Sequence, residues 1–289
     1  MCLTEARPTV LMIFLLRFLV GAAMDAGIFA DRNFGRILLT ALAWELAVFS
    51  AYLFNGVMDV HEDRVNGSHR PIARGTLSVA LATRVAGGAA MLSLLICLVL
   101  GTEIAVAVLI LLILGWLYSG PPAFLKRRTL GTPFTCVTYG MLTYFVGFAA
   151  AAGDDWSRPS AALFMFAGAM SLWMGLVGVP AKDLSDVSGD AAAGRRTLPV
   201  VCGDTAIRYA MSATACVLAI TFCLVSAYIT PPLNWANVVM LGGAAAVAAI
   251  SLSRSSRIGR PQLRRPFRAF MATQYLVNLC ALTPVVVPL

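Results

Sequence analysis

Half of the acidic residues of this 289-residue chain lie in two short segments. Seven of the 14 Asp and Glu residues are found there: Asp59, Glu62 and Asp63 in the first segment, and Asp183, Asp186, Asp190 and Asp204 in the second. Asn55, Asp59 and Asp63 follow one another at intervals of four residues. This spacing places the three side chains on one face of a helix. The first three acids of the second segment, spaced by three and four, also predict one helical face.

Carboxylates that share a helical face repel one another unless a cation binds among them. Oxygen-only ligands suit Mg²⁺, which typically takes one or two carboxylates together with substrate phosphates. Basic residues are interleaved with the acids in the sequence: Arg70, Arg74, Lys126, Lys182, Arg195 and Arg196. The combination indicates a site where magnesium bridges protein carboxylates to a phosphate or diphosphate. The alternative is an ion-paired cap with a structural role only.

The composition indicates the class of protein that carries these acidic segments. The chain is 59% hydrophobic and 12% charged, with a mean hydropathy of +0.81, whereas an average soluble domain is about a quarter charged. A polytopic membrane protein is therefore predicted, with its first apolar block retained as a helix. The net charge of +8 is assigned to loops that flank membrane spans, so no nucleic-acid partner is expected. The seven scattered Cys residues do not have metal-site spacing.

Nine membrane spans are expected in one all-α bundle, since a span needs roughly 20 apolar residues. They are placed near residues 9–30, 36–58, 79–100, 103–119, 131–151, 160–180, 205–228, 235–252 and 267–287. The prediction is a single domain over residues 1–289, with two related halves of about 1–130 and 131–289. Each half carries one acidic segment after an even-numbered span, an arrangement common in membrane proteins built from repeats.

Basic residues set the expected orientation. Loops after even-numbered spans hold fifteen Lys and Arg residues, and loops after odd-numbered spans hold three. By the positive-inside rule, the N-terminus and both acidic segments face the cytoplasm. The chain is thus expected to be a multi-pass protein of the cell (inner) membrane, with membrane lipid around it.

Three stretches of the sequence resemble one known family. Asn55-x3-Asp59-x3-Asp63 is followed by Arg70-Pro71, residues 118–126 read YSGPPAFLK, and residues 182–200 read KDLSDVSGDAAAGRRTLPV. In this order they are similar to the first Asp-rich motif, the linking Y-S-x-P-P-x-x-x-K stretch and the second Asp-rich motif of UbiA-superfamily intramembrane prenyltransferases. The resemblance covers nearly the whole chain.

The resemblance implies transfer of a prenyl group from an isoprenyl diphosphate to an aromatic or other lipophilic acceptor. Two or more Mg²⁺ ions would be held by Asn55, Asp59, Asp63, Asp183, Asp186 and Asp190. Diphosphate binding is expected of Asn55, Arg70, Tyr118, Lys126 and Lys182, and catalytic roles of Asp59, Asp63, Asp186 and Asp190. The donor would ionise to an allylic carbocation within the membrane, which the acceptor then attacks. The runner-up is a terpene cyclase of the same family, in which the cation attacks its own chain.

Two further positions bear on the acceptor. Glu45 lies near the middle of the second predicted span, where a charge is expensive and usually functional, so it is also a candidate catalytic residue. Its alternative is a protonated or hydrogen-bonded packing residue. At Gly178 many members of the family have a Tyr four residues before the Lys of the second motif. Its absence leaves the acceptor and the route of proton removal open.

Two other classes fit less well. A transporter would place its charges near the midplane of the membrane, whereas these acids cluster at one face. A membrane phosphotransferase that acts on alcohol head groups would also use Asp and Mg²⁺, but its D-G-x2-A-R signature is absent from the sequence.

Overall fold

The structure is a computed structural model that describes residues 1–26, 34–65, 67–153, 159–228 and 233–286. All regular secondary structure in these residues is helical. Helices satisfy every backbone hydrogen bond internally, which lipid demands because it offers no partner. The long helices have 18 to 25 residues, the length needed to cross a hydrocarbon core of about 30 Å.

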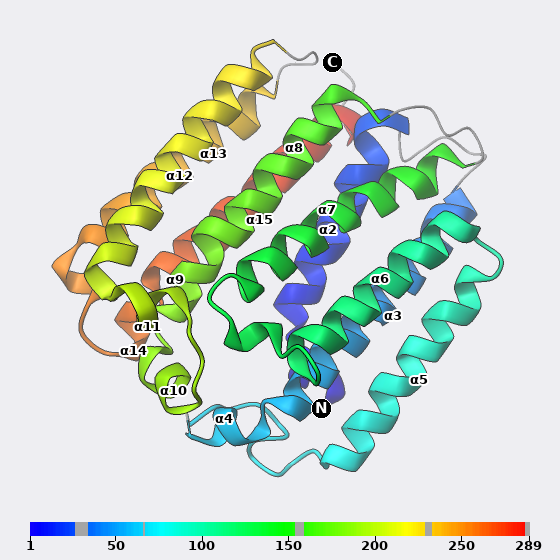
Figure 1. Cartoon of the computed structure of the whole chain (residues 1–289). Coiled ribbons are helices and arrows are strands. Elements are labelled where there is room, and N and C mark those ends of the chain that lie inside the picture. Colours follow the sequence, from blue (N-terminus) through cyan, green and yellow to red (C-terminus); the bar gives the residue numbers. More distant parts are fainter. Residues whose placement is uncertain (27–33, 66, 154–158, 229–232, 287–289) are drawn as a thin grey trace. The chain divides into compact units, whose positions relative to one another are not determined.

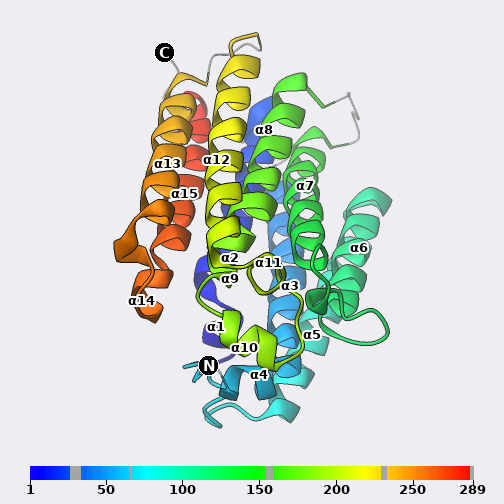
Figure 2. The same cartoon turned by 60° about the vertical axis from the view of Figure 1, so that its left-hand side comes forward.

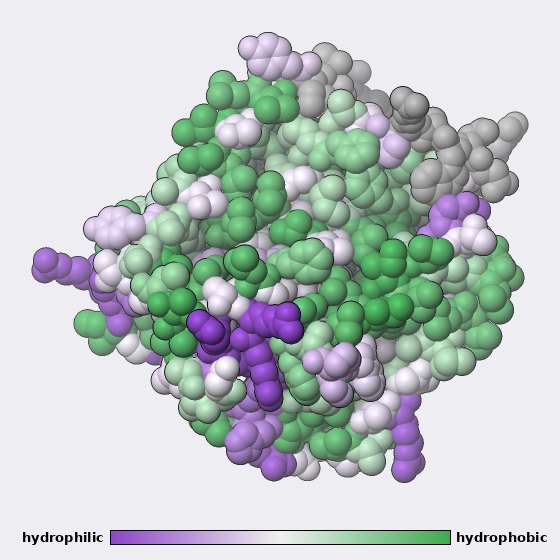
Figure 3. Space-filling model, in the orientation of Figure 1, coloured by the Kyte–Doolittle hydropathy of each residue, from purple (hydrophilic) through white to green (hydrophobic). Residues whose placement is uncertain are grey.

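Seven stretches of the described residues are long and apolar enough to cross a membrane. They are Phe34–Met58, Val79–Cys97, Thr102–Ser119, Gly131–Ala152, Ala161–Asp183, Asp204–Ser226 and Asn234–Leu252. Helices α2 (Pro8–Ala26) and α15 (Arg265–Val286) lie at the first and last predicted spans, but they are not among the seven. A polytopic all-α membrane protein is confirmed, and the count of nine spans stays a prediction. Apolar side chains dominate the face drawn in Figure 3, as a lipid-facing surface requires.

The chain divides into two compact units. Unit 1 comprises residues 1–126 and 142–158, and unit 2 comprises residues 127–141 and 159–289. Helix α7 (Gly131–Ala152) contributes its first half to unit 2 and its second half to unit 1.

Unit 1 is built around α3 (Phe34–Met58). Its other helices are α1 (Cys2–Glu5), α2, α4 (Val60–Val65), α5 (Val79–Cys97) and α6 (Thr102–Ser119). Helices α5 and α6 both pack against α3 (Figure 1). Two serine hydroxyls connect α3 and α5: Ser50 of α3 donates to Ala86 O at 2.8 Å, and Ser93 of α5 donates to Ala43 O at 2.6 Å. Hydroxyl bonds and small residues are the usual means of association between helices in lipid.

Unit 2 contains the remaining helices (Figure 2). They are α8 (Ala161–Leu172), the π-helical turn η2 (Trp173–Gly178), α9 (Val179–Asp183), α10 (Val187–Ala192), α11 (Leu198–Cys202), α12 (Asp204–Ser226), α13 (Asn234–Leu252), α14 (Arg260–Leu263) and α15. Helix α13 packs against both α12 and α15. Buried Arg208 on α12 connects this helix to α13 and to the short 3-10 helix η3 (Arg254–Ser256), because its guanidinium donates to Ser251 O and to Ser256 Oγ, each at 2.9 Å.

Candidate active site

The first acidic motif lies where α3 passes into α4. Helical backbone bonds continue through the junction, with Asp59 N donating to Asn55 O at 2.9 Å and Asp63 N donating to Asp59 O at 2.8 Å. The predicted spacing of one turn is therefore kept, although α3 ends at Met58. The amide of Asn55 donates to Ser119 Oγ at 3.2 Å, which connects the motif to the end of α6.

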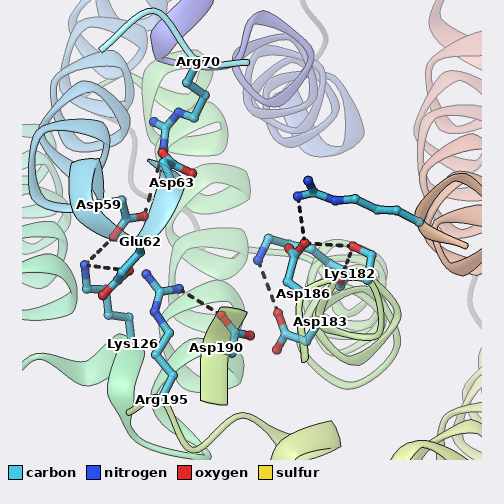
Figure 4. Close-up of polar contacts among 12 residues, drawn as sticks. Asp59, Glu62, Asp63, Arg70, Lys126, Lys182, Asp183, Asp186, Asp190 and Arg195 are labelled. Atoms are coloured by element: carbon cyan, nitrogen blue, oxygen red, sulfur yellow. Dashed lines mark hydrogen bonds and ion pairs between the residues drawn. The ribbon is translucent and has the colours of Figure 1, made fainter. Parts of the chain in front are cut away.

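Two basic side chains hold the acids of the first motif (Figure 4). Lys126 is 2% exposed, and its ammonium forms ion pairs with Asp59 and, at 3.7 Å, with Glu62. Arg70 Nη1 lies 2.8 Å from Asp63 Oδ2 and 4.0 Å from Asp59 Oδ2. The sequence predicted four of these residues for the site, and unit 1 brings them together, with Glu62 added to the group.

Glu5 is a member of this group that the sequence reasoning missed. It ends helix α1 and is fully buried. Its carboxylate forms an ion pair with Arg70, with Oε1 2.8 Å from Nε, and its Oε2 accepts a bond from Ile72 N at 2.9 Å. The available signal was a single acid before the first apolar block, far in sequence from any motif.

The second acidic motif belongs to unit 2 and departs from the single helix that was expected. Helix α9 ends at Asp183 and α10 begins at Val187, so the helix is interrupted within the motif. Asp190 N still donates to Asp186 O at 2.8 Å, and Asp186 N donates to Asp183 O at 3.0 Å. The three acids thus lie at the end of one helix and in the first turns of the next.

Each acid of the second motif contacts one cation within unit 2. Asp183 is buried, and its Oδ1 lies 3.3 Å from Lys182 Nζ. Asp190 is also buried, 3.7 Å from Arg195 Nη1. Arg260 of α14 lies 3.2 Å from Asp186 Oδ1. The contacts of Lys182 and Arg195 are drawn in Figure 4.

The donor set of the second motif fits a divalent cation. Burial is the largest cause that raises the pKa of the Asp190 carboxyl to about 7; the charges of neighbouring Asp183 and Asp186 act in the same direction, and Lys182 opposes them. A bound cation would relieve this repulsion and favour the ionised carboxylate. Among the residues that the structure describes, no three Asp, Glu, His or Cys side chains are gathered as a finished metal site. Their partners are instead Lys and Arg.

Other predicted residues lie outside these ion pairs. Glu45 on α3 is half-buried, and its Oε1 is enclosed with no hydrogen-bond partner. Tyr118 is half-buried beside Ser119 at the end of α6. Asp204 does not join the second motif, because its carboxylate pairs with Arg208 at 2.8 Å.

Position 178 is closed to any side chain. A Cβ on Gly178 would overlap the ring of Phe270. That ring stacks on Trp173 at 5.9 Å and on Phe267 at 5.8 Å between centroids. Phe270, which comes from α15, therefore occupies the space beside position 178.

Comparison with known proteins places this arrangement in a family. The sequence model of the UbiA prenyltransferase family matches residues 14–278. Digeranylgeranylglyceryl phosphate synthase of Methanopyrus kandleri is 31% identical over 198 residues, which are 67% of this chain and 67% of that protein. The 2-acyl-4-prenylphloroglucinol 6-prenyltransferase of Humulus lupulus is 28% identical over 158 residues, 52% of this chain and 38% of that protein.

Solved structures share the fold. A UbiA homologue from Archaeoglobus fulgidus bound to GPP and Mg²⁺ has a TM-score of 0.70 at 20% identity, with 99% of both chains covered. A UbiA homologue from Aeropyrum pernix, without ligand, has a TM-score of 0.62 at 18% identity, with 94% of this chain and 96% of that chain covered. The chain therefore belongs to the UbiA prenyltransferase family and is a multi-pass membrane prenyltransferase.

Proposed function

We propose that the protein transfers a prenyl group from an isoprenyl diphosphate to an aromatic or other lipophilic acceptor, with Mg²⁺ as cofactor. One observation carries the proposal: both acidic motifs combine buried carboxylates with Lys and Arg partners. Carboxylates bind the metal, and cations bind the diphosphate oxygens, so both parts of a metal–diphosphate complex have matching ligands.

The residues form two overlapping sets by proposed role. The oxygen ligands of Mg²⁺ are Asn55, Asp59, Asp63, Asp183, Asp186 and Asp190. The residues that bind the diphosphate are Arg70, Tyr118, Lys126 and Lys182, together with Asn55. When bound, Mg²⁺ neutralises the charge that develops on the leaving diphosphate. Lys126 and Lys182 contribute to the same stabilisation by donating to diphosphate oxygens.

The reaction proposed for this site is ionisation followed by capture. The bond between the allylic carbon and the diphosphate oxygen breaks, and its electron pair leaves with the diphosphate. The apolar helices exclude water from the resulting carbocation, which would otherwise be hydrolysed. The acceptor then supplies the electron pair of the new bond, and a proton leaves the acceptor.

Glu45 is proposed to act on the acceptor. Its enclosed Oε1 without a hydrogen-bond partner is available to accept a bond from an acceptor hydroxyl or to take its proton. A buried polar atom that stays unpaired raises the free energy of the metal- and substrate-free protein. A substrate group that satisfies this atom removes the penalty.

The test of this function is incubation of the purified protein with Mg²⁺ and prenyl diphosphates of C10 to C20. Reactions with and without phenolic and naphthoic acceptors are followed by diphosphate release and by mass spectrometry. We expect acceptor-dependent prenylated products. Absence of Mg²⁺-dependent diphosphate release from every donor would refute the proposal, and a hydrocarbon formed from the donor alone would identify a cyclase.

The same assay tests Glu45. Glu45→Gln keeps the size of the side chain and removes its capacity as a base. We expect slower product formation or an altered acceptor preference, with Mg²⁺ dependence unchanged. Full turnover with the same acceptor preference would remove Glu45 from the mechanism.

A further inference from the structure

Arg70 is held by two acidic residues within unit 1, Asp63 and Glu5. Its Nη1 contacts Asp63 at 2.8 Å. Glu5 binds the guanidinium twice, through the carboxylate, 2.8 Å from Nε, and through the backbone carbonyl, which accepts from Nη2 at 3.0 Å. Two of the three guanidinium nitrogens are therefore directed at Glu5, and one is directed at the acidic motif.

Burial makes this arrangement electrostatically important. Glu5 is fully buried and Arg70 is 9% exposed, so water does little to screen the pair. A buried carboxylate persists only with strong partners, and Arg70 together with Ile72 N provides them. Without Glu5, the whole positive charge of Arg70 would act on Asp63 and on Asp59, which lies 4.0 Å from Nη1.

The carboxylates and cations that contact one another around Arg70 show how Glu5 affects the charge of the first motif. Four carboxylates, those of Glu5, Asp59, Glu62 and Asp63, contact the two cations Arg70 and Lys126. Within these contacts, carboxylates outnumber cations by two. Removal of the Glu5 charge would reduce this excess by one, although Glu5 lies outside the first acidic segment of the sequence.

Gly56 is the second, independent observation. A Cβ at this position of α3 would collide with Glu5 Oε1 and would lie 2.6 Å from Arg70 Nη2. The absence of a side chain, one residue after Asn55, is what allows the Glu5–Arg70 pair to lie against the helix that carries the motif. The position of this pair is therefore fixed from three separate segments of the chain.

We propose that Glu5 is a positioning residue for the first acidic motif: it neutralises and orients Arg70, and thereby sets the affinity of the motif for Mg²⁺. This inference rests on the proposed function, because it assumes that Asp59 and Asp63 bind the metal. It assigns a role in metal binding to the short N-terminal helix α1, which precedes every predicted membrane span.

The test measures metal binding directly, without turnover. Purified full-length protein in detergent is titrated with Mn²⁺, and free Mn²⁺ is followed by electron paramagnetic resonance. Mg²⁺ protection against thermal unfolding is measured in parallel. Loss of an outer partner of a metal site typically weakens metal binding by about 10- to 100-fold. We expect Glu5→Gln to weaken Mn²⁺ binding by roughly ten-fold, and Glu5→Asp, which keeps the charge, to restore most of the affinity.

Gly56→Ala tests the same arrangement from α3, and it should weaken Mn²⁺ binding in the same direction. The matched control is Gly35→Ala, since a Cβ on Gly35 in the same helix meets nothing within 4 Å. If Glu5→Gln does not fold, the Gly56 and Gly35 variants still decide the question. In the transfer assay, Glu5→Gln should raise the Mg²⁺ concentration needed for half-maximal rate, while kcat at saturating Mg²⁺ stays near the wild-type value.

The outcomes separate the inference from the function on which it rests. If the wild type binds Mn²⁺ and both Glu5→Gln and Gly56→Ala bind it equally well, the positioning role of Glu5 is overturned and the function stands. A purely structural role of Glu5 would give that result, with a lower melting temperature as its only sign. If the wild type binds no divalent cation, the proposed magnesium site is overturned together with the inference.

Discussion

At the scale of single residues, the acidic motifs contain buried charged side chains. A buried ion pair is weak evidence for stability, since an apolar replacement of both partners is often neutral or stabilising. Lys126, Asp183 and Asp190 are all buried. The proposed metal–diphosphate ligand would account for their presence in such an apolar chain, because it needs both signs of charge.

Asp190 and Asp204 make a matched pair of variants. Asp190→Asn should lower prenyl transfer by at least about 100-fold, because it removes a proposed metal ligand. Folding should be little affected without metal, since burial already raises the pKa of Asp190 to about 7. Initial rates and melting temperatures in detergent measure the two effects.

Asp204→Asn is the control from the same segment. Its carboxylate pairs with Arg208, so the substitution should lower the melting temperature and leave the rate per folded molecule near the wild-type value. Equal loss of rate in the two variants would show that Asp204 acts with the motif.

At the scale of elements, the second acidic motif lies where a long helix is interrupted. The span that begins at Ala161 passes through the π-helical turn η2 before α9. π-Helical turns are rare in proteins overall, but those that occur are often found at functional sites. The helix breaks again after Asp183, so the acids of the second motif lie at the ends of α9 and α10. They therefore do not share one continuous helical face.

Gly178 closes the π-helical turn against α15, which gives a prediction for this element. Gly178→Ala should lower the melting temperature, because its Cβ would overlap the ring of Phe270, which is fully buried. Overpacking of a filled core typically costs about 1–3 kcal/mol. Thermal unfolding followed by tryptophan fluorescence measures the change.

Gly168→Ala is the control, because a Cβ at that position of α8 meets nothing within 4 Å. It should raise or leave unchanged the melting temperature, as Ala is a better helix former than Gly. An equal response of the two variants would contradict the role given to Phe270.

At the scale of the whole molecule, the distribution of charge along the chain predicts its orientation in the membrane. The excess of Lys and Arg in loops after even-numbered spans predicts that both acidic motifs face the cytoplasm. Cys202 follows the second motif and is exposed. Thr102, also exposed, is the first residue of α6, at the end predicted to face the opposite side of the membrane.

Single-cysteine variants test this orientation. A variant that keeps only Cys202 should react with a membrane-impermeant maleimide in inside-out vesicles and stay unlabelled in right-side-out vesicles. Thr102→Cys in a background without other cysteines should give the opposite pattern. Reversed labelling of both would show that the motifs face the other side of the membrane.

Much of the fold and part of the site follow from sequence because their causes are local. Apolar runs of a spanning length determine membrane helices, and a four-residue spacing determines that Asp59 and Asp63 lie on successive turns. The interruption after Asp183 was not predictable from spacing, since helix breaks depend on what packs around the chain as much as on propensity.

The sequence by itself therefore determined a polytopic helical membrane protein with two acidic motifs and the chemistry that those motifs imply. Only the tertiary structure decided which cation each acid meets. Arg260 reaches Asp186 from α14, and Glu5 reaches Arg70 across 65 positions of the chain. Contacts between distant segments leave no periodic signal in one sequence, because they depend on packing in three dimensions, and the role proposed for Glu5 rests on such a contact.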